Sequence, residues 1–172
     1  MVGISAMALM GCRNTQEAVS PTVNYTQYQT YRFGSRAMVG SENPLFKWAQ
    51  LSSRIEKALE FHLPSAGLDY ASIGSEPDLI IFYYVVTETG TEPPMVNYLV
   101  GWKAAPFLAR GEQFSEYEEN RLVLDFVDAA NDELVWRRST DLSLKSEKEA
   151  YRELSKKIRE LVQKYPHPPP KS

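Results

Sequence analysis

Cysteine is nearly absent from this sequence, and it lacks both an excess of positive charge and an apolar run long enough to cross a membrane. A single cysteine in 172 residues excludes an internal disulfide and a zinc site built from several cysteines. The net charge of −3, with Lys and Arg interspersed among Asp and Glu, gives none of the basic surface that a phosphate backbone requires. We therefore expect no nucleic-acid partner.

The residue types that usually carry catalysis or bind metals are also sparse. His62 lies near the end of a predicted helix, where a cation suits the helix dipole, and His167 lies in the tail, so neither has a partner at metal-ligand spacing. Asp125 and Asp128 are three residues apart on a predicted strand and therefore point to opposite faces. We expect Asp128 to close a turn and Asp125 to lie on the exposed face, rather than both to act as an acid and base pair.

The sequence contains no G-x-S-x-G elbow, P-loop, G-x-G-x-x-G or H-E-x-x-H motif. No residue is therefore predicted to be catalytic or to bind a metal or cofactor, and we expect a protein that is not an enzyme. What the composition does supply is a core: hydrophobic residues make up 43% of the chain and charged residues 24%, with ten Tyr, seven Phe and three Trp. This is typical of one globular domain.

The N-terminal segment is apolar and uncharged up to the cysteine. As a helix, residues 1–11 would extend only about 16 Å, against roughly 30 Å of bilayer hydrocarbon, so they suit the apolar region of a signal peptide. Leu9-Met10-Gly11-Cys12 resembles a bacterial lipobox. The resemblance implies acylation of Cys12, cleavage before it, and a membrane anchor made of several acyl chains.

Two interpretations of this segment remain open. A signal peptide normally begins with Lys or Arg, and none precedes Cys12; we interpret this as a start codon assigned too far downstream. The alternative is that residues 1–11 begin a buried helix of a cytosolic domain, with Cys12 in its core. The polar residues 13–24 favour the lipoprotein, because they have the composition of a flexible tether with a reach of about 18 to 20 Å. Arg13 resembles the sorting signal for the outer membrane, so we expect anchoring at its periplasmic face.

Residues 25–172 carry the strand and helix patterns of a single domain. Residues 25–33 predict a strand ended by Gly34-Ser35, and the unbroken apolar run at 78–87 predicts a strand in the middle of a sheet. Residues 122–128 and 134–137 predict a β-hairpin with a five-residue connection. Residues 96–102, within the irregular segment 88–119, have the composition of a further strand.

Two amphipathic helices complete the pattern. The first begins at Asn43-Pro44 and ends before Pro64, with a stripe of Leu45, Trp48, Ser52, Ile55 and Leu59. The second begins with a capping box at Ser146 and ends at Pro166, with a stripe of Ala150, Leu154, Ile158, Leu161 and Tyr165. We predict an α+β fold in which both helices pack on one face of a mostly antiparallel sheet.

Several of these segments together resemble the bacterial envelope lipoprotein family of domain of unknown function 4136. The matching pieces are Thr30-Tyr31-Arg32-Phe33, Pro77-Asp78-Leu79-Ile80, Leu124-Asp125-Phe126-Val127-Asp128, Leu134-Val135-Trp136-Arg137 and Tyr165-Pro166, in this order behind the lipobox. The family has no assigned activity, so the resemblance implies a location and a fold but no reaction. The Gly-rich tract that such proteins often carry before the hairpin is thin here.

Three functions are compatible with this pattern. The first is a non-enzymatic module that binds an envelope protein or wall polymer through a sheet face, a strand edge or the aromatic segment 88–119. The second is a carrier of lipid or another hydrophobe, in a cavity between helices and sheet lined by Phe82, Tyr84 and Trp102. The third is a hydrolase with no recognisable motif.

Two aromatic groups have alternative roles at this stage. Trp136-Arg137-Arg138 offers an arginine and aromatic contact surface, or places Trp136 in the core of the hairpin. Tyr25, Tyr28 and Tyr31 line a groove or pack under the sheet.

Overall fold

The computed structural model describes residues 18–39, 48–86, 120–142 and 146–166. In chain order its elements are β1 (Ala18–Val19), the 3-10 turn η1 (Tyr25–Gln27), β2 (Thr30–Val39), α1 (Trp48–His62), the 3-10 turn η2 (Leu63–Ala66), β3 (Asp69–Tyr70), β4 (Leu79–Val86), β5 (Arg121–Asp128), β6 (Leu134–Asp141) and α3 (Glu147–Val162). The strands form one sheet in the order β1-β6-β5-β4-β2-β3.

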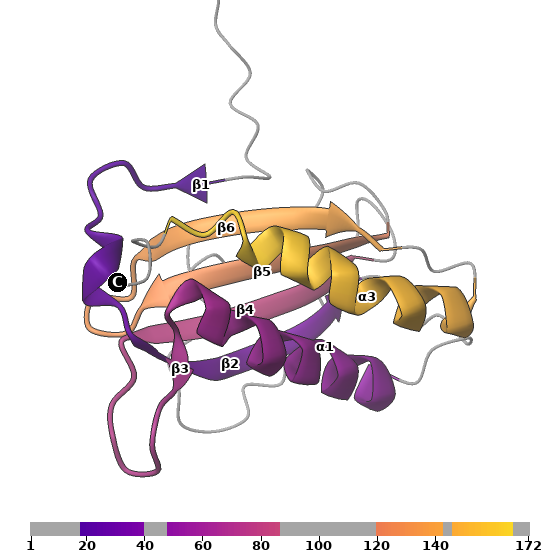
Figure 1. The fold of residues 1–172 in the computed structure, drawn as a ribbon, viewed down its shortest axis with the longest axis horizontal. Helices are drawn as coiled ribbons and strands as arrows, with labels where there is room; N and C mark the ends of the chain where they lie inside the picture. Colours follow the sequence, from indigo (N-terminus) through magenta and orange to yellow (C-terminus); the bar gives the residue numbers. More distant parts are fainter. Residues whose placement is uncertain (1–17, 40–47, 87–119, 143–145, 167–172) are drawn as a thin grey trace, which may run out of the picture.

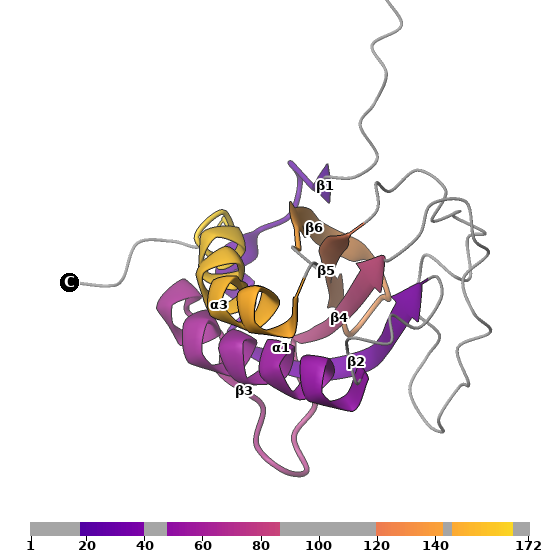
Figure 2. The same ribbon diagram turned by 90° about the vertical axis from the view of Figure 1, so that its right-hand side faces the viewer.

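Both helices lie on the same face of this sheet, and they run side by side in the same direction (Figure 1). The view at right angles shows the helical layer and the sheet as two separate layers (Figure 2). The predicted α+β class and the placement of the helices are therefore confirmed. None of the helices in the described part of the chain is both long and apolar enough to cross a bilayer.

The sheet is mixed, which corrects one detail of the prediction. β4, β5 and β6 pair antiparallel, but β2 runs parallel to both β4 and β3. The physical reason is the connection: after β2 the chain passes through α1, which returns it to the end of the sheet where β2 began. A helical crossover of this kind joins parallel strands.

β2 begins later and ends later than the sequence predicts. Tyr25–Gln27 is a 3-10 turn, whose first turn is capped by the Asn24 side chain accepting from Thr26 N at 3.2 Å. Gly34 does not end the strand; the register with β4 shifts between Phe33 and Arg36, and pairing then continues to Val39. Position 34 favours glycine, because a Cβ there would lie 2.5 Å from a ring carbon of Phe82.

The ordered domain also begins before Tyr25, within the residues that the sequence predicts as a tether. β1 pairs antiparallel with β6 opposite Trp136 and Arg137. Ser20 N donates to the Val135 carbonyl at 3.1 Å, and the Tyr25 hydroxyl donates to the same oxygen at 2.6 Å. Residues 18–24 therefore lie against the edge of the sheet, and residues 12–17 lie outside the described part.

The predicted stripes of both helices face the core at the positions whose side chains are described, which leaves out Leu45, Trp48 and Ala150. Ser52, Ile55 and Leu59 of α1 are buried, as are Leu154, Ile158 and Leu161 of α3 and Tyr165 beyond its end. Ser146 caps α3 by accepting from Glu149 N at 3.3 Å, as the capping box predicts. The predicted start of the first helix at Asn43-Pro44 lies outside the described residues.

Candidate functional site

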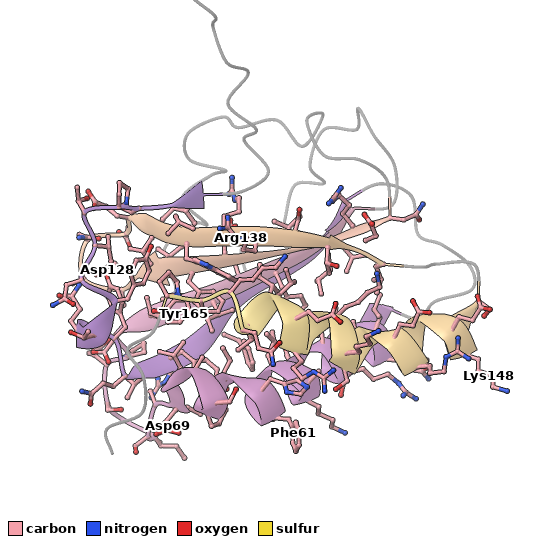
Figure 3. All side chains as sticks on the ribbon, turned by 45° about the horizontal axis from the view of Figure 1, so that its top comes forward. Phe61, Asp69, Asp128, Arg138, Lys148 and Tyr165 are labelled. Carbon is pink, nitrogen blue, oxygen red and sulfur yellow. The ribbon has the colours of Figure 1, made fainter. Side chains whose placement is uncertain are left out.

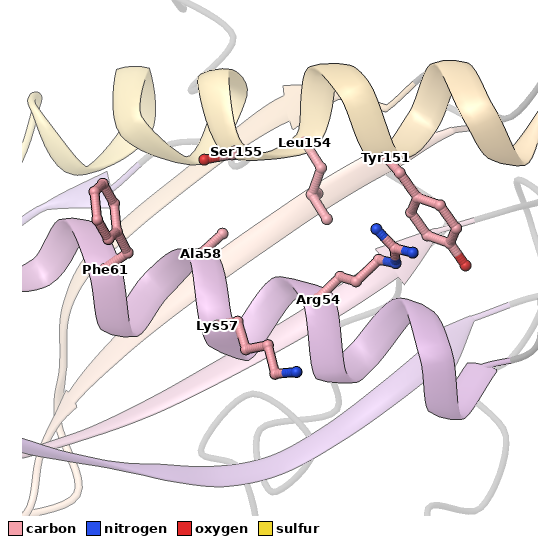
Figure 4. Close-up of a pocket in the computed structure, with 7 residues that line it drawn as sticks. All are labelled: Arg54, Lys57, Ala58, Phe61, Tyr151, Leu154 and Ser155. Atoms are coloured by element: carbon pink, nitrogen blue, oxygen red, sulfur yellow. The ribbon is translucent and has the colours of Figure 1, made fainter.

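A groove runs between α1 and α3 on the outer surface of the helical layer (Figure 4). Its volume is about 470 Å³, and it is open to solvent. It is lined by Arg54, Lys57, Ala58, Phe61, Tyr151, Leu154 and Ser155. This lining combines charged, aromatic and apolar side chains.

Helical spacing explains how these residues come to share one surface. Arg54, Ala58 and Phe61 follow one another at intervals of four and three residues, so they lie on the side of α1 that faces α3. Leu154 and Ser155 lie on the corresponding side of α3. Ala58 and Leu154 are buried and form the floor of the groove. The small Ala58 side chain leaves room for the two helices to pack closely.

One end of the groove is cationic. The Arg54 guanidinium lies over the Tyr151 ring, 3.7 Å from its centroid, which holds the charge at the rim. Lys57 is exposed beside it. No carboxylate of the described residues pairs with Arg54 or Lys57, and no carboxylate lines the groove. Anions are therefore attracted to this end.

The acidic residues of α1 do not contribute to the groove. Glu56 faces the sheet, where its Oε1 accepts from the Tyr83 hydroxyl at 2.8 Å. Glu60 is exposed, and its charge contributes to the raised pKa of Tyr31 after the larger effect of burial. Neither carboxylate lines the groove.

The other end of the groove is aromatic. Phe61 is 77% exposed and projects outward from α1 (Figure 3). Its ring meets that of His62 edge to face, with centroids 5.0 Å apart, and His62 Nε2 lies 3.0 Å from Ser155 Oγ. The exposed Phe61 ring therefore adds an apolar surface at this end of the groove.

The structure changes the expected protonation of His62. Burial lowers the pKa of His62 below its ordinary value, and the nearby Arg159 lowers it further. Although a cation at this end of α1 would suit the helix dipole, desolvation and the Arg159 charge oppose it. Both effects favour the neutral form of His62, which links α1 to α3 through Ser155.

The prediction that Asp125 lies on the exposed face is wrong. Asp125 is 1% exposed, and Arg137 donates to both of its oxygens, from Nε to Oδ1 and from Nη2 to Oδ2, at 2.7 Å each. The two residues lie directly opposite each other on β5 and β6, on the face of the sheet away from the helices. That face is buried as well, so an unpaired carboxylate there would be costly.

Asp128 closes the turn of the hairpin, as predicted. Its Oδ1 accepts from Ala130 N at 2.8 Å, and its Oδ2 accepts from the Tyr28 hydroxyl at 2.8 Å. Burial and this hydrogen bond raise the pKa of Tyr28 to about 12. Asp125 and Asp128 thus have separate structural roles and do not form a catalytic pair.

The aromatic groups whose roles were open belong to the core. Trp136 is fully buried and packs on Phe126, with ring centroids 4.6 Å apart. Tyr25, Tyr28 and Tyr31 are buried under the sheet rather than lining a groove.

The prediction that Phe82 and Tyr84 line a cavity between the helices and the sheet is wrong. Tyr83 faces α1, so its neighbours Phe82 and Tyr84 point to the opposite face of the sheet, away from the helices. Trp102, Cys12 and His167 lie outside the described residues. No cluster of three His, Cys, Asp or Glu within the described ranges is placed to hold a metal ion.

Sequence reasoning did not find the groove. Arg54, Ala58 and Phe61 recur at helical spacing beside the buried stripe of α1, and an exposed Phe in such a row is a detectable signal. Tyr151 and Ser155 give no comparable signal, because their role depends on how α3 packs beside α1.

Comparison with known proteins assigns the family and the fold. The family described as domain of unknown function DUF4136 matches residues 15–167, which confirms the resemblance seen in the sequence. No curated protein matches the chain.

Solved structures that are similar to this chain come from several bacteria. A DUF4136 family protein from Bacteroides thetaiotaomicron is 14% identical, with a TM-score of 0.55 over 86% of this chain and 91% of that chain. A PDZ domain protein from Parabacteroides distasonis is 16% identical, with a TM-score of 0.51 over 90% of this chain but 35% of that chain. The PelC dodecamer from Paraburkholderia phytofirmans has a TM-score of 0.44 at 11% identity, over 85% of this chain and 91% of that chain. At these identities the first two matches show a shared fold alone, and nothing is concluded from the third.

Proposed function

The chain belongs to the DUF4136 family, and from this membership, its fold and its N-terminal sequence we propose that it is a lipid-anchored protein of the bacterial envelope that binds a partner without catalysing a reaction. The observation that carries the binding role is the α1–α3 groove, with its cationic rim, apolar floor and exposed Phe61. Side chains of this kind suit recognition rather than bond making.

The anchor in this proposal is Cys12. Leu9-Met10-Gly11-Cys12 supports acylation at the sulfur of Cys12, and Arg13 supports the periplasmic face of the outer membrane as the location. Several acyl chains on one residue would hold the domain at the membrane, because each buried methylene adds about 0.8 kcal/mol.

Intact mass and membrane fractionation of the protein expressed from its native locus test the anchor. We expect a species that begins at Cys12, carries acyl mass and sediments with the membranes, and a longer species when lipoprotein signal peptidase is inhibited. Cys12→Ala should release the protein from the membrane, whereas Ser5→Ala, in the same N-terminal segment, should not. A soluble chain that retains residues 1–11 would contradict the anchor.

Retention of envelope components by the immobilised protein tests the binding role. Envelope extract separated into protein, glycan and lipid fractions is applied to the intact chain and to the double variant Arg54→Glu, Phe61→Ala. We expect one fraction to be retained by the intact chain and lost by the variant. Equal retention by both would contradict a role for the groove.

A further inference from the structure

We propose that the α1–α3 groove binds an acidic, amphipathic segment of a partner protein, with its carboxylates at Arg54 and Lys57 and an apolar side chain on the floor beside Phe61. This inference rests on the proposed function of the groove as a binding surface, and it specifies the chemistry of the partner.

The charge of the groove selects an anion. Arg54 and Lys57 are both exposed and have no carboxylate partner among the described residues, although the chain as a whole has a net charge of −3. Stacking on Tyr151 holds the Arg54 guanidinium in one place, which lowers the entropy lost when it pairs with a carboxylate.

The rest of the groove selects an apolar side chain. Ala58 and Leu154 provide a buried apolar floor, and the exposed Phe61 ring forms a wall at the end opposite to Arg54. A hollow between two packed helices suits the apolar face of a third amphipathic segment, as in helix-in-groove recognition.

A glycan fits these residues poorly. The Tyr151 face is covered by Arg54, so it is not available to stack on a sugar ring. Ser155 is the only neutral hydroxyl besides that of Tyr151 in the lining, and it already contacts His62 Nε2. Sugar recognition needs more hydrogen-bonding groups than this lining offers.

A lipid surface also fits poorly. Side chains that insert into a membrane project from a convex surface, whereas Ala58 and Leu154 form the floor of a hollow. The combination of a recessed apolar floor and a cationic rim therefore favours an acidic peptide segment.

Site-specific photocrosslinking in intact cells tests the inference with the full chain. Phe61→p-benzoylphenylalanine places a photoreactive ring at the end of the groove. The matched control is Ile73→p-benzoylphenylalanine, which is fully exposed on the loop between β3 and β4. Mass spectrometry of the crosslinked product identifies the attached molecule and, for a protein, the crosslinked segment.

We expect position 61, but not position 73, to crosslink to a protein at a segment rich in Asp and Glu. Adding Arg54→Glu and Lys57→Glu should lower the yield about tenfold or more, because two charge pairs are reversed. Lys164→Glu, an exposed lysine outside the groove, should leave the yield unchanged.

The other outcomes overturn the inference in distinguishable ways. A product carrying lipid or glycan at position 61 would contradict the acidic segment while leaving the groove as a binding surface. A basic or uncharged protein segment would do the same. No product above that at position 73 would contradict both the inference and the proposed function.

Discussion

Arg137 and Asp125 form a doubly hydrogen-bonded ion pair in the interior of the protein, with both donor–acceptor distances at 2.7 Å. The side chains are nearly inaccessible, and they face each other across β5 and β6. In this position each charge offsets much of the cost of burying the other.

We expect Asp125→Ala or Arg137→Ala to lower the free energy of unfolding by about 3 to 5 kcal/mol, since each removes the ion-pair partner of a buried charge. The double variant Asp125→Leu, Arg137→Met should lose much less, because it removes both charges. Urea denaturation followed by circular dichroism measures these changes.

The pair Arg121–Asp141, in which the carboxylate is exposed, supplies the control for this prediction. Its Asp141 side chain is largely accessible and the two groups are 3.5 Å apart, so Asp141→Ala should cost less than about 1 kcal/mol. Equal losses for Asp125→Ala and Asp141→Ala would contradict a special role for the buried pair.

His62 should titrate below its ordinary pKa. Burial and Arg159 disfavour its charged form, so an NMR titration of the ring protons should give a pKa below 6.5, and Arg159→Gln should raise that value. If the pKa of His62 is the same in Arg159→Gln as in the parent, Arg159 does not contribute and burial alone lowers it. Lys164→Gln, which removes a charge that does not contribute to the shift, is the control.

The same shift gives a pH dependence of stability with a definite sign. The folded-state pKa of His62 is lower than the unfolded one, so the unfolded state binds the proton more readily. The contribution of neutral His62 is fully present above pH 6.5 and is lost as the pH falls from there through its folded pKa. His62→Gln should remove this part of the pH dependence.

Asp78 joins the start of β4 to the start of β2. Its Oδ2 accepts from Gln29 N at 2.9 Å, Thr30 N at 2.8 Å and Thr30 Oγ1 at 2.9 Å. Burial raises the pKa of Asp78, but these hydrogen bonds outweigh it, so its pKa lies below the ordinary value. The carboxylate thus stabilises the parallel pairing of β2 with β4.

Asp78→Asn should therefore destabilise the protein by about 1 to 2 kcal/mol at neutral pH, because an amide accepts these bonds more weakly. The depressed pKa means that the contribution is present above pH 4 and lost as the pH falls through the folded pKa of Asp78. The difference between Asp78→Asn and the parent should shrink in acid. A difference that stays constant down to pH 2 would exclude this titration as its origin.

The elements best predicted from the sequence are those whose signals are local. Ser146 begins α3, and Leu154 and Ile158 face the core, because capping and helical periodicity depend only on neighbouring residues. The β5–β6 hairpin and the central strand β4 follow for the same reason.

The features that the sequence does not predict depend on long-range packing. Leu122, Leu124 and Phe126 assign Asp125 to the opposite face of β5, but whether that face is buried depends on the rest of the fold. In the same way, Arg54 meets Tyr151 only because α1 and α3 pack side by side. The parallel pairing of β2 with β4 likewise follows from where α1 returns the chain.

Gly34 provides a test of how closely β2 and β4 pack. A Cβ at this position would lie 2.5 Å from Phe82 Cε1 and 2.7 Å from Ile80 Cγ2, so both side chains must move to accommodate it. We expect Gly34→Ala to lower the free energy of unfolding by about 1 to 3 kcal/mol, the usual cost of overpacking.

Gly74→Ala is the control for steric crowding, because nothing lies within 4 Å of a Cβ at this position. Its φ of +87° means that this substitution costs only local backbone strain. The contacts at Gly34 are with the Phe82 ring, so Phe82→Leu should reduce the cost of Gly34→Ala if steric crowding is its cause. A double-mutant cycle of the two substitutions measures this coupling by urea denaturation. Additive losses would show that the glycine is required for the backbone of the β2 bulge rather than for contact with Phe82.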